Sequence, residues 1–199
     1  MLLLLWGCGA LHPASSPQPI IYSLGGERTA PTSAQPPPGA ATAGLTLIVS
    51  PPHAAAGFDS PRMMYLRRAN QLEYFAQNEW VDTPARMLAP LIVAAVGGSG
   101  VFRAVMTSPS TAAGEMRLDT EVLRLQHEFL GTPSQVRFTL RAYLVESATR
   151  RVIATQEFDI AVPAGSEDPH GGVVAANRAV QIVLADLSIF CAETARNRR

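Results

Sequence analysis

The residues of this chain that could carry reactive or metal-binding chemistry are few and far apart. Its histidines do not lie at metal-ligand spacing from a cysteine or a carboxylate; they are His12, His53, His127 and His170. The glycine-rich run at residues 97–100 follows a predicted helix, whereas a phosphate-binding loop precedes one. Asp168-Pro169-His170 falls in a predicted loop without a nucleophile motif to accompany it. We therefore expect no catalytic site, no metal and no cofactor.

A cysteine near the amino terminus is the residue whose surroundings suggest a defined modification. Leu5-Trp6-Gly7-Cys8 resembles a bacterial lipobox, in which a small residue precedes a cysteine whose thiol receives diacylglycerol. Trp6 departs from the pattern, because that position usually carries a small residue. The apolar run ends at Pro13, too early for a transmembrane helix, and a strand here would have no domain to pack against. We interpret the run as the end of an export signal that lacks its charged start; the alternative is a chance cysteine.

Composition separates a tether from a single domain. The chain has 199 residues, 47% of them hydrophobic, which is enough for one well-buried domain. Its 16 basic residues, all Arg, balance 16 acidic ones, so nucleic acid is not an expected partner. We predict a signal segment at 1–7 and a tether at 8–19 that is rich in Pro and Ser and begins with lipidated Cys8. The domain covers 20–193 with a flexible Pro-rich loop at 27–44, and a basic tail covers 194–199.

Strand and helix signals fill the first half of the domain. Residues 20–24 and 45–50 are short apolar runs typical of strands, and the second lacks alternation, which predicts that both its faces are covered. Residues 63–76 fit a helix about as well as two short strands. A helix is predicted from Thr83, an N-cap followed by Pro84, to the glycines at 97–100, with a kink or break at Pro90. A strand at 101–106 follows.

Three long strands and a final helix are predicted in the second half. Strands at 116–129, 135–145 and 151–162 alternate apolar and polar residues, which indicates a sheet with one buried face. The clearest apolar set is Val136, Phe138, Leu140, Ala142 and Leu144. Residues 163–172 are predicted as a loop, and 173–193 as a helix that carries Cys191 as a small buried residue. The fold class is α+β: a mixed, largely antiparallel sheet packed against two main helices in a single domain.

Aromatic residues gather just before the first helix. They are Tyr65, Tyr74, Phe75 and Trp80. Such a cluster is either part of the core, which is the more common case because aromatic rings dominate core burial, or a binding surface. The residues alone leave both interpretations open.

Several segments taken together resemble a known family. They are 45–49 (LTLIV) before Pro51-Pro52, 62–65 (RMMY), 72–75 (LEYF), 79–84 (EWVDTP), 101–105 (VFRAV), 158–160 (FDI) and 175–179 (AANRA). Over residues 22–193 the chain resembles the ABC-type transport auxiliary lipoprotein family, most specifically around Trp80. The resemblance implies a β-hairpin before Trp80, with strands at 63–67 and 72–76. Glu79, Pro90 and the long Pro-rich stretch depart from the family pattern, and the family has no catalytic motif to carry over.

The resemblance also implies a function. Members accompany MCE-type transport systems, the Pqi-like and Mla-like machines, which move lipids between the inner and outer membranes. It implies a lipid-anchored subunit at the outer membrane, facing the periplasm, that binds an MCE-domain protein and an ABC permease/ATPase complex. We expect a homo-oligomer, with a partner contact on an exposed face around Tyr65, Tyr74 and Trp80. The alternatives are a lipid-binding carrier, which needs an apolar cavity on the order of several hundred Å³, and a structural adaptor of a secretion or lipopolysaccharide-assembly machine.

Overall fold

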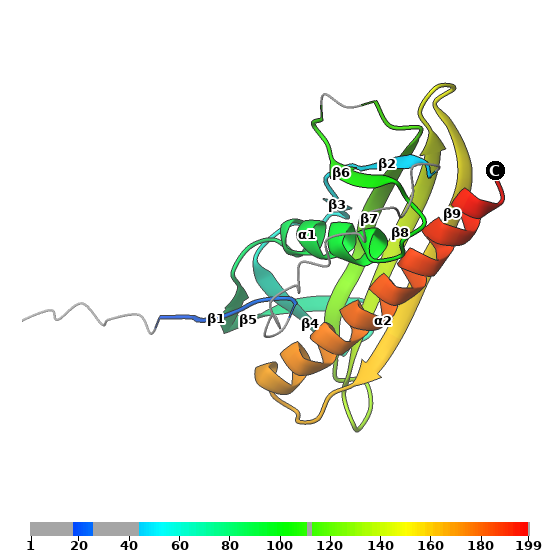
Figure 1. Ribbon diagram of the computed structural model, residues 1–199. Helices are drawn as coiled ribbons and strands as arrows, with labels where there is room; N and C mark the ends of the chain where they lie inside the picture. Colours follow the sequence, from blue (N-terminus) through cyan, green and yellow to red (C-terminus); the bar gives the residue numbers. More distant parts are fainter. Residues whose placement is uncertain (1–17, 26–43, 111–112, 199) are drawn as a thin grey trace, which may run out of the picture.

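The structure is a computed structural model that describes residues 18–25, 44–110 and 113–198. These residues form one mixed sheet of nine strands with two helices on one of its faces (Figure 1). The strands are β1 (Ile20–Tyr22), β2 (Thr46–Val49), β3 (His53–Ala54), β4 (Arg62–Arg68), β5 (Gln71–Trp80), β6 (Ala104–Thr107), β7 (Met116–Glu128), β8 (Gln135–Glu146) and β9 (Arg151–Pro163). The helices are α1 (Pro84–Gly97) and α2 (Pro169–Arg196). The predicted α+β class is confirmed.

Strand β7 is the centre of the sheet. On one side β8 pairs antiparallel with it along its whole length, and β9 pairs antiparallel with β8. Its other edge is shared by three short strands, β2, β3 and β4, which follow one another along β7 and run parallel to it. Pro51-Pro52 separates β2 from β3, because proline has no amide to donate to a ladder. The loop at 55–61 separates β3 from β4. Beyond them lie β6 next to β2, and β5 and then β1 next to β4.

Alternation along β8 separates a buried face from a polar face. The predicted apolar set is at most 3% exposed: Val136, Phe138, Leu140, Ala142 and Leu144. On the opposite face Arg137 and Arg141 form ion pairs with Asp159 and Glu157 of β9. The sheet therefore keeps one face for the helices and one for water, as the alternation in the sequence predicts.

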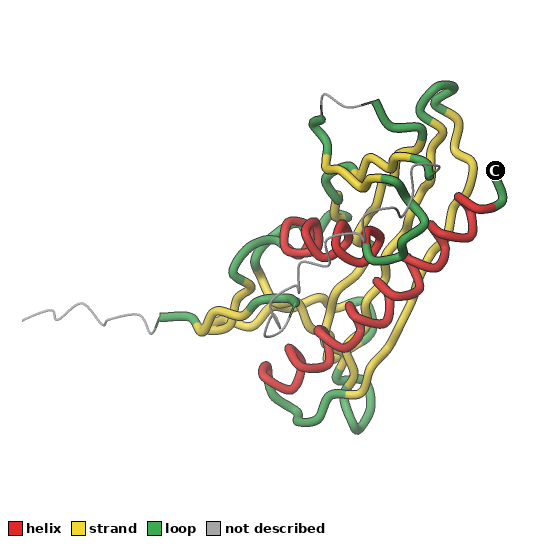
Figure 2. Tube along the Cα trace, in the orientation of Figure 1, coloured by secondary structure: helices red, strands yellow, loops and turns green. Residues whose placement is uncertain are grey.

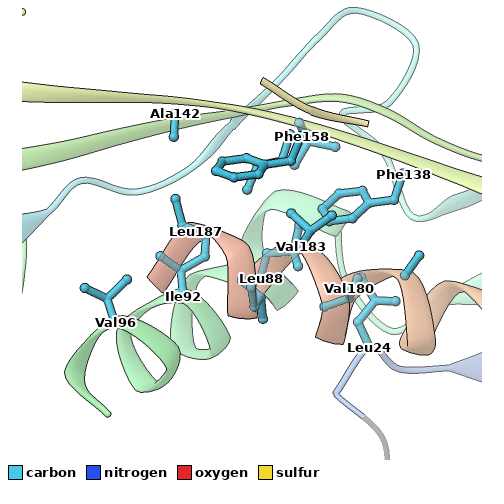
Figure 3. Close-up of a cluster of buried hydrophobic side chains, with 14 of the residues drawn as sticks. Leu24, Leu88, Ile92, Val96, Phe138, Ala142, Phe158, Val180, Val183 and Leu187 are labelled. Atoms are coloured by element: carbon cyan, nitrogen blue, oxygen red, sulfur yellow. The ribbon is translucent and has the colours of Figure 1, made fainter. Parts of the chain in front are cut away.

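Helix α2 lies across the buried face of the long strands and also contacts α1 (Figures 1 and 2). Figure 3 shows Leu187 of α2 between Ile92 of α1 and Phe158 of β9. Leu187 and Ile92 are fully buried, and each such side chain contributes about 2 kcal/mol to the hydrophobic stabilisation. By length and composition α2 could cross a membrane, but here it is a core helix of the domain.

Both helices begin at a capped proline. Thr83 Oγ1 accepts from the Arg86 amide ahead of Pro84, as predicted. Asp168 Oδ1 accepts from the Gly171 amide at 2.7 Å ahead of Pro169, so α2 starts at 169 and the predicted loop at 163–172 is too long. The same helix continues past residue 193 to Arg196.

A kink or a break is predicted at Pro90, and helix α1 runs unbroken through it, so the break is absent. Pro90 and Arg86 are both exposed, and the Arg86 carbonyl that loses its intrahelical partner can therefore be hydrated. The glycines at 97–100 end the helix as predicted, and β6 begins at Ala104, three residues later than the predicted strand at 101–106.

The start of α2 is fixed to the sheet through the buried His127. Its Nε2 forms a 2.8 Å hydrogen bond with Ser134 Oγ, and the Ser134 amide donates to Glu167 Oε1 at 2.8 Å. Gly172 faces the ring so closely that a Cβ there would lie 2.5 Å from His127 Nδ1. Burial lowers the pKa of His127, and the nearby carboxylates of Glu167 and Asp168 offset this only in part. The folded protein therefore holds this imidazole neutral.

We predict that His127 makes the folded state less stable as the pH falls. Its folded-state pKa lies below the unfolded value of about 6.5, so below that pH the unfolded chain binds a proton that the folded chain does not. The free energy of unfolding from urea titrations should be constant just above pH 6.5 and should decrease below it. His127→Gln should lower this slope relative to that of the wild type. If the free energy of unfolding of His127→Gln fell with pH as steeply as that of the wild type, His127 would not be the source of the pH dependence.

We predict that Thr120→Val stabilises the domain. Thr120 is 2% exposed, and its Oγ1 has no hydrogen-bond partner among the described residues. Replacing an unsatisfied buried hydroxyl by a methyl group should raise the free energy of unfolding by about 1 kcal/mol. Thr139→Val is the matched control: Thr139 is equally buried, but its Oγ1 donates to Asp159 Oδ1 at 2.7 Å, so the same change should destabilise. Urea titrations measure the free energy of unfolding of both variants, and an equal change in the two would contradict the prediction.

Candidate partner-binding surface

The β4–β5 hairpin carries the aromatic residues that the sequence singled out. Met64 lies opposite Tyr74, Tyr65 opposite Glu73 and Leu66 opposite Leu72, which confirms the hairpin that the resemblance implies. At its turn Asn70 has φ 64°, a left-handed conformation that Asn adopts more readily than most residues. The side chains alternate between the side of the sheet that carries the helices and an outer side.

Two of the three predicted contact residues are buried. Tyr65 is 8% exposed and Trp80 5%, whereas Tyr74 is 49% exposed. The expected exposed face around all three is therefore wrong for Tyr65 and Trp80, because their strand positions turn them toward the core. The core interpretation of the aromatic cluster holds for these two residues, and the surface interpretation remains possible for Tyr74 alone.

Tyr65 is held by polar and aromatic contacts. Its hydroxyl donates to Glu73 Oε2 at 2.9 Å, and this hydrogen bond raises the pKa of the phenol. Its ring centroid lies 4.6 Å from that of Phe75 and 6.0 Å from that of Phe129. Tyr65 therefore positions the hairpin against the sheet and does not present its ring to a partner.

The outer side of the hairpin forms an apolar strip, which we call the hairpin strip. Its members are Met64, Leu66, Leu72 and Tyr74. Leu72 is 40% exposed, and the guanidinium of Arg62 lies 4.3 Å from the centroid of the Tyr74 ring. An exposed aromatic side chain that is orientated by an arginine and flanked by aliphatic residues is the type of surface that binds proteins.

Sequence reasoning missed three of the four members of the hairpin strip. The available signal was the alternation within MMYLRR and QLEYF, which places 64 and 66 with 72 and 74 on one side and 63 and 65 with 73 and 75 on the other. Tyr65 and Tyr74 lie on opposite sides of the hairpin, so aromatic residue type alone does not define one surface.

The chain enters the domain at β1, an edge strand that pairs with β5. Its Ile20 and Ile21 are more than half exposed. The predicted lipidation site Cys8 lies outside the described residues. The twelve residue steps from Cys8 to Ile20 span at most about 43 Å when fully extended, so a lipid on Cys8 would keep the start of β1 within that distance of the bilayer.

Reactive groups in the described residues are occupied by structural roles. Cys191 is fully buried, as predicted, and burial raises the pKa of its thiol to about 12. Asp168 caps α2, and His127 is enclosed against Ser134. Within the described ranges no three His, Cys, Asp or Glu side chains come together to hold a metal ion. Cys191, Asp168 and His127 therefore serve the fold.

The interior between the hairpin and α2 is closely packed. The space lined by Met63, Phe75, Trp80, His127 and Gly172 has a volume of about 20 Å³, which accommodates a water molecule but not an acyl chain. Two larger clefts of about 490 Å³ each are open to solvent and include charged residues such as Arg151 and Arg86 in their lining. The described part of the domain thus gives no support to a lipid-carrier function.

Solved structures similar to this chain show that the fold is shared. A protein of Xanthomonas campestris matches with 24% identity and a TM-score of 0.72, covering 91% of this chain and 96% of that chain. An uncharacterised protein matches with 12% identity and a TM-score of 0.62, covering 74% and 92%. A hypothetical protein of Chlamydia trachomatis matches with 10% identity and a TM-score of 0.50, covering 73% and 96%. At these identities the likeness establishes the fold and nothing further.

Sequence comparison establishes the family. No curated protein matches the chain significantly. The model of the ABC-type transport auxiliary lipoprotein component matches residues 22–188, which is nearly the whole folded domain. Neither that family nor the similar structures indicate an enzyme. The chain therefore belongs to the ABC-type transport auxiliary lipoproteins, envelope proteins that are anchored by lipid and assist a transporter.

Proposed function

We propose that this protein is a lipid-anchored accessory subunit of an MCE/ABC-type intermembrane lipid transport system and acts by binding partner proteins at the outer membrane. The observation that carries the proposal is the family match over residues 22–188. The proposed partners are an MCE-domain protein and an ABC permease/ATPase complex, and we also propose a homo-oligomer.

Protein binding fits the chemistry of the described residues better than catalysis or lipid carriage. His127 and Asp168 are engaged in a hydrogen bond and a helix cap, and the space beneath the hairpin is too small for a lipid. The hairpin strip is the apolar surface that we propose as the partner contact. Tyr74 is its central residue, because a half-exposed aromatic ring can bury a large area at a small cost in conformational entropy.

The anchor proposed at Cys8 would confine this surface to the membrane. A single acyl chain holds a protein only marginally, whereas the two or three chains of a mature lipoprotein hold it firmly. The tether at 8–19 would then let the domain stand away from the bilayer while β1 stays near it. Facing the periplasm from the outer membrane, the domain would meet a transporter that reaches from the inner membrane.

The lipid-carrier alternative conflicts with the packed interior beneath the hairpin. The structural-adaptor alternative shares the anchor and the fold, and differs only in the partner. Identification of proteins that copurify with the chain from native membranes separates this alternative from the proposal, because a transport role requires permease, ATPase or MCE-domain proteins among them.

The anchor predicts lipid labelling at Cys8. Metabolic labelling with a palmitate analogue should mark the wild-type chain and leave Cys8→Ser unlabelled, because the thiol is the acceptor of the diacylglycerol. Cys191→Ala is the matched control and should keep its label, since Cys191 is buried in the core. Equal labelling of the wild type and Cys8→Ser, normalised to the amount of protein, would exclude the anchor.

The hairpin strip predicts a loss of partner binding in Tyr74→Ala. Truncating a central aromatic contact should reduce the amount of transporter proteins that copurify by roughly tenfold. The domain should stay folded, because Tyr74 is 49% exposed. Tyr143→Ala, on β8 of the polar sheet face, is the matched control and should copurify as the wild type does. If Tyr74→Ala copurified the same amount of transporter proteins as the wild type, the partner contact would not lie at the hairpin strip. The proposed anchor at Cys8 would be unaffected by that result.

A further inference from the structure

Strand β9 is a long sheet edge. Its residues Arg151–Pro163 pair with β8 on one side, and no described strand pairs with the other side. Thr155 and Ala161 are exposed, and for an alanine this means that the backbone beside it is accessible. In Figure 1 no other strand lies beyond β9 on that side. Natural proteins usually shorten, bend or cover such an edge, because its free amides and carbonyls can pair with another chain.

The free edge lies between two pairs of carboxylates. On the polar face of the sheet, Glu157 and Asp159 pair with Arg141 and Arg137 and still have side chains that are 47% and 44% exposed. On the helix side Asp186 and Glu193 of α2 line a hollow of about 180 Å³, together with Gln156, Ile189 and Phe190. Asp186 and Glu193 take part in none of the ion pairs of the described residues.

The charges argue against a second copy of this chain at this edge. Two β9 strands paired antiparallel about an axis near Phe158 would set Glu157 of one copy beside Asp159 of the other. Like charges directly opposite each other across strands are destabilising. In that register the edge does not complement a second copy, whereas Glu157 and Asp159 complement a strand with basic residues at alternate positions.

We propose that the β9 edge binds an extended basic segment of a partner protein as an added strand. The main chain of the segment would pair with the free amides and carbonyls of β9, which provides affinity in strand addition. Its basic side chains on one face would meet Glu157 and Asp159. On the other face one Lys or Arg would lay its aliphatic stem on Ile189 and Phe190 and place its cation between Asp186 and Glu193.

This surface is separate from the hairpin strip, so the proposal does not depend on the proposed function. Strand β9 lies on the far side of β8 from β7, whereas β4 and β5 lie on the opposite side of β7. Two partner segments could therefore occupy the same domain at once.

A fluorescein-labelled peptide that alternates Arg and Val, with one central Val replaced by Arg so that both faces of the added strand carry a cation, tests the proposal with the full chain. Fluorescence anisotropy at low ionic strength should show binding, and hydrogen exchange should show that the amides of β9 become protected. The double variant Asp186→Asn/Glu193→Gln should weaken binding roughly fivefold. The control variant Asp59→Asn/Glu79→Gln removes the same charge elsewhere and should change the affinity by less than about twofold.

Two further peptides separate strand addition from attraction by charge alone. A peptide that alternates Glu and Val should not bind, and the Arg peptide with methylated backbone amides at alternate positions should lose most of its affinity. The proposal would be overturned if the methylated peptide bound as tightly as the unmethylated one, or if the two double variants lost the same affinity. It would also be overturned if the peptide protected amides outside β9 and not those of β9. Sedimentation of the free chain as a dimer with β9 already protected would also overturn it, since a second copy would then hold the edge.

Discussion

Hydrogen bonding at both edges of β7 is the interaction on which the rest of the structure depends. One edge pairs with β8 from end to end, and the other holds β2, β3 and β4 in sequence. Segments that are far apart in the chain are thereby brought into one sheet, and every other strand is attached through one of these partners. Because β7 has no free edge left, the accessible edges of the sheet lie on strands farther out, including β1 and β9.

The two faces of this sheet have different roles. The face of Phe138 and Phe158 is covered by α2 and α1, and close packing leaves almost no space beneath the hairpin. The other face carries ion pairs and stays in contact with water. The surfaces that we propose for partner binding, the hairpin strip and the β9 edge, lie at opposite sides of this sheet.

The long elements could be predicted because their patterns are local and repeated. Strand β8 and the stripe of α2 show many consecutive apolar positions at the spacing of a strand or a helix. The start of α2 carries a local signal as well, because Asp168-Pro169 is an N-cap followed by a proline, and this signal places the helix start earlier than the apolar stripe does. At Pro90 helix α1 continues where Arg86 and Pro90 are exposed, and that exposure is a property of the folded surface and not of the local sequence.

The sequence by itself determined the class of fold, the family, the main helices and strands, and the absence of a recognisable catalytic motif, because each of these follows from residue types and their spacing. Only the tertiary structure decided which aromatic residues are exposed. Tyr65 and Tyr74 are similar in type and lie on adjacent strands, but the register of the hairpin turns one inward to Glu73 and Phe75 and the other outward. The side of a strand that becomes buried depends on what packs against it, and for the hairpin that packing comes from β7 and α2, which lie far away in the sequence.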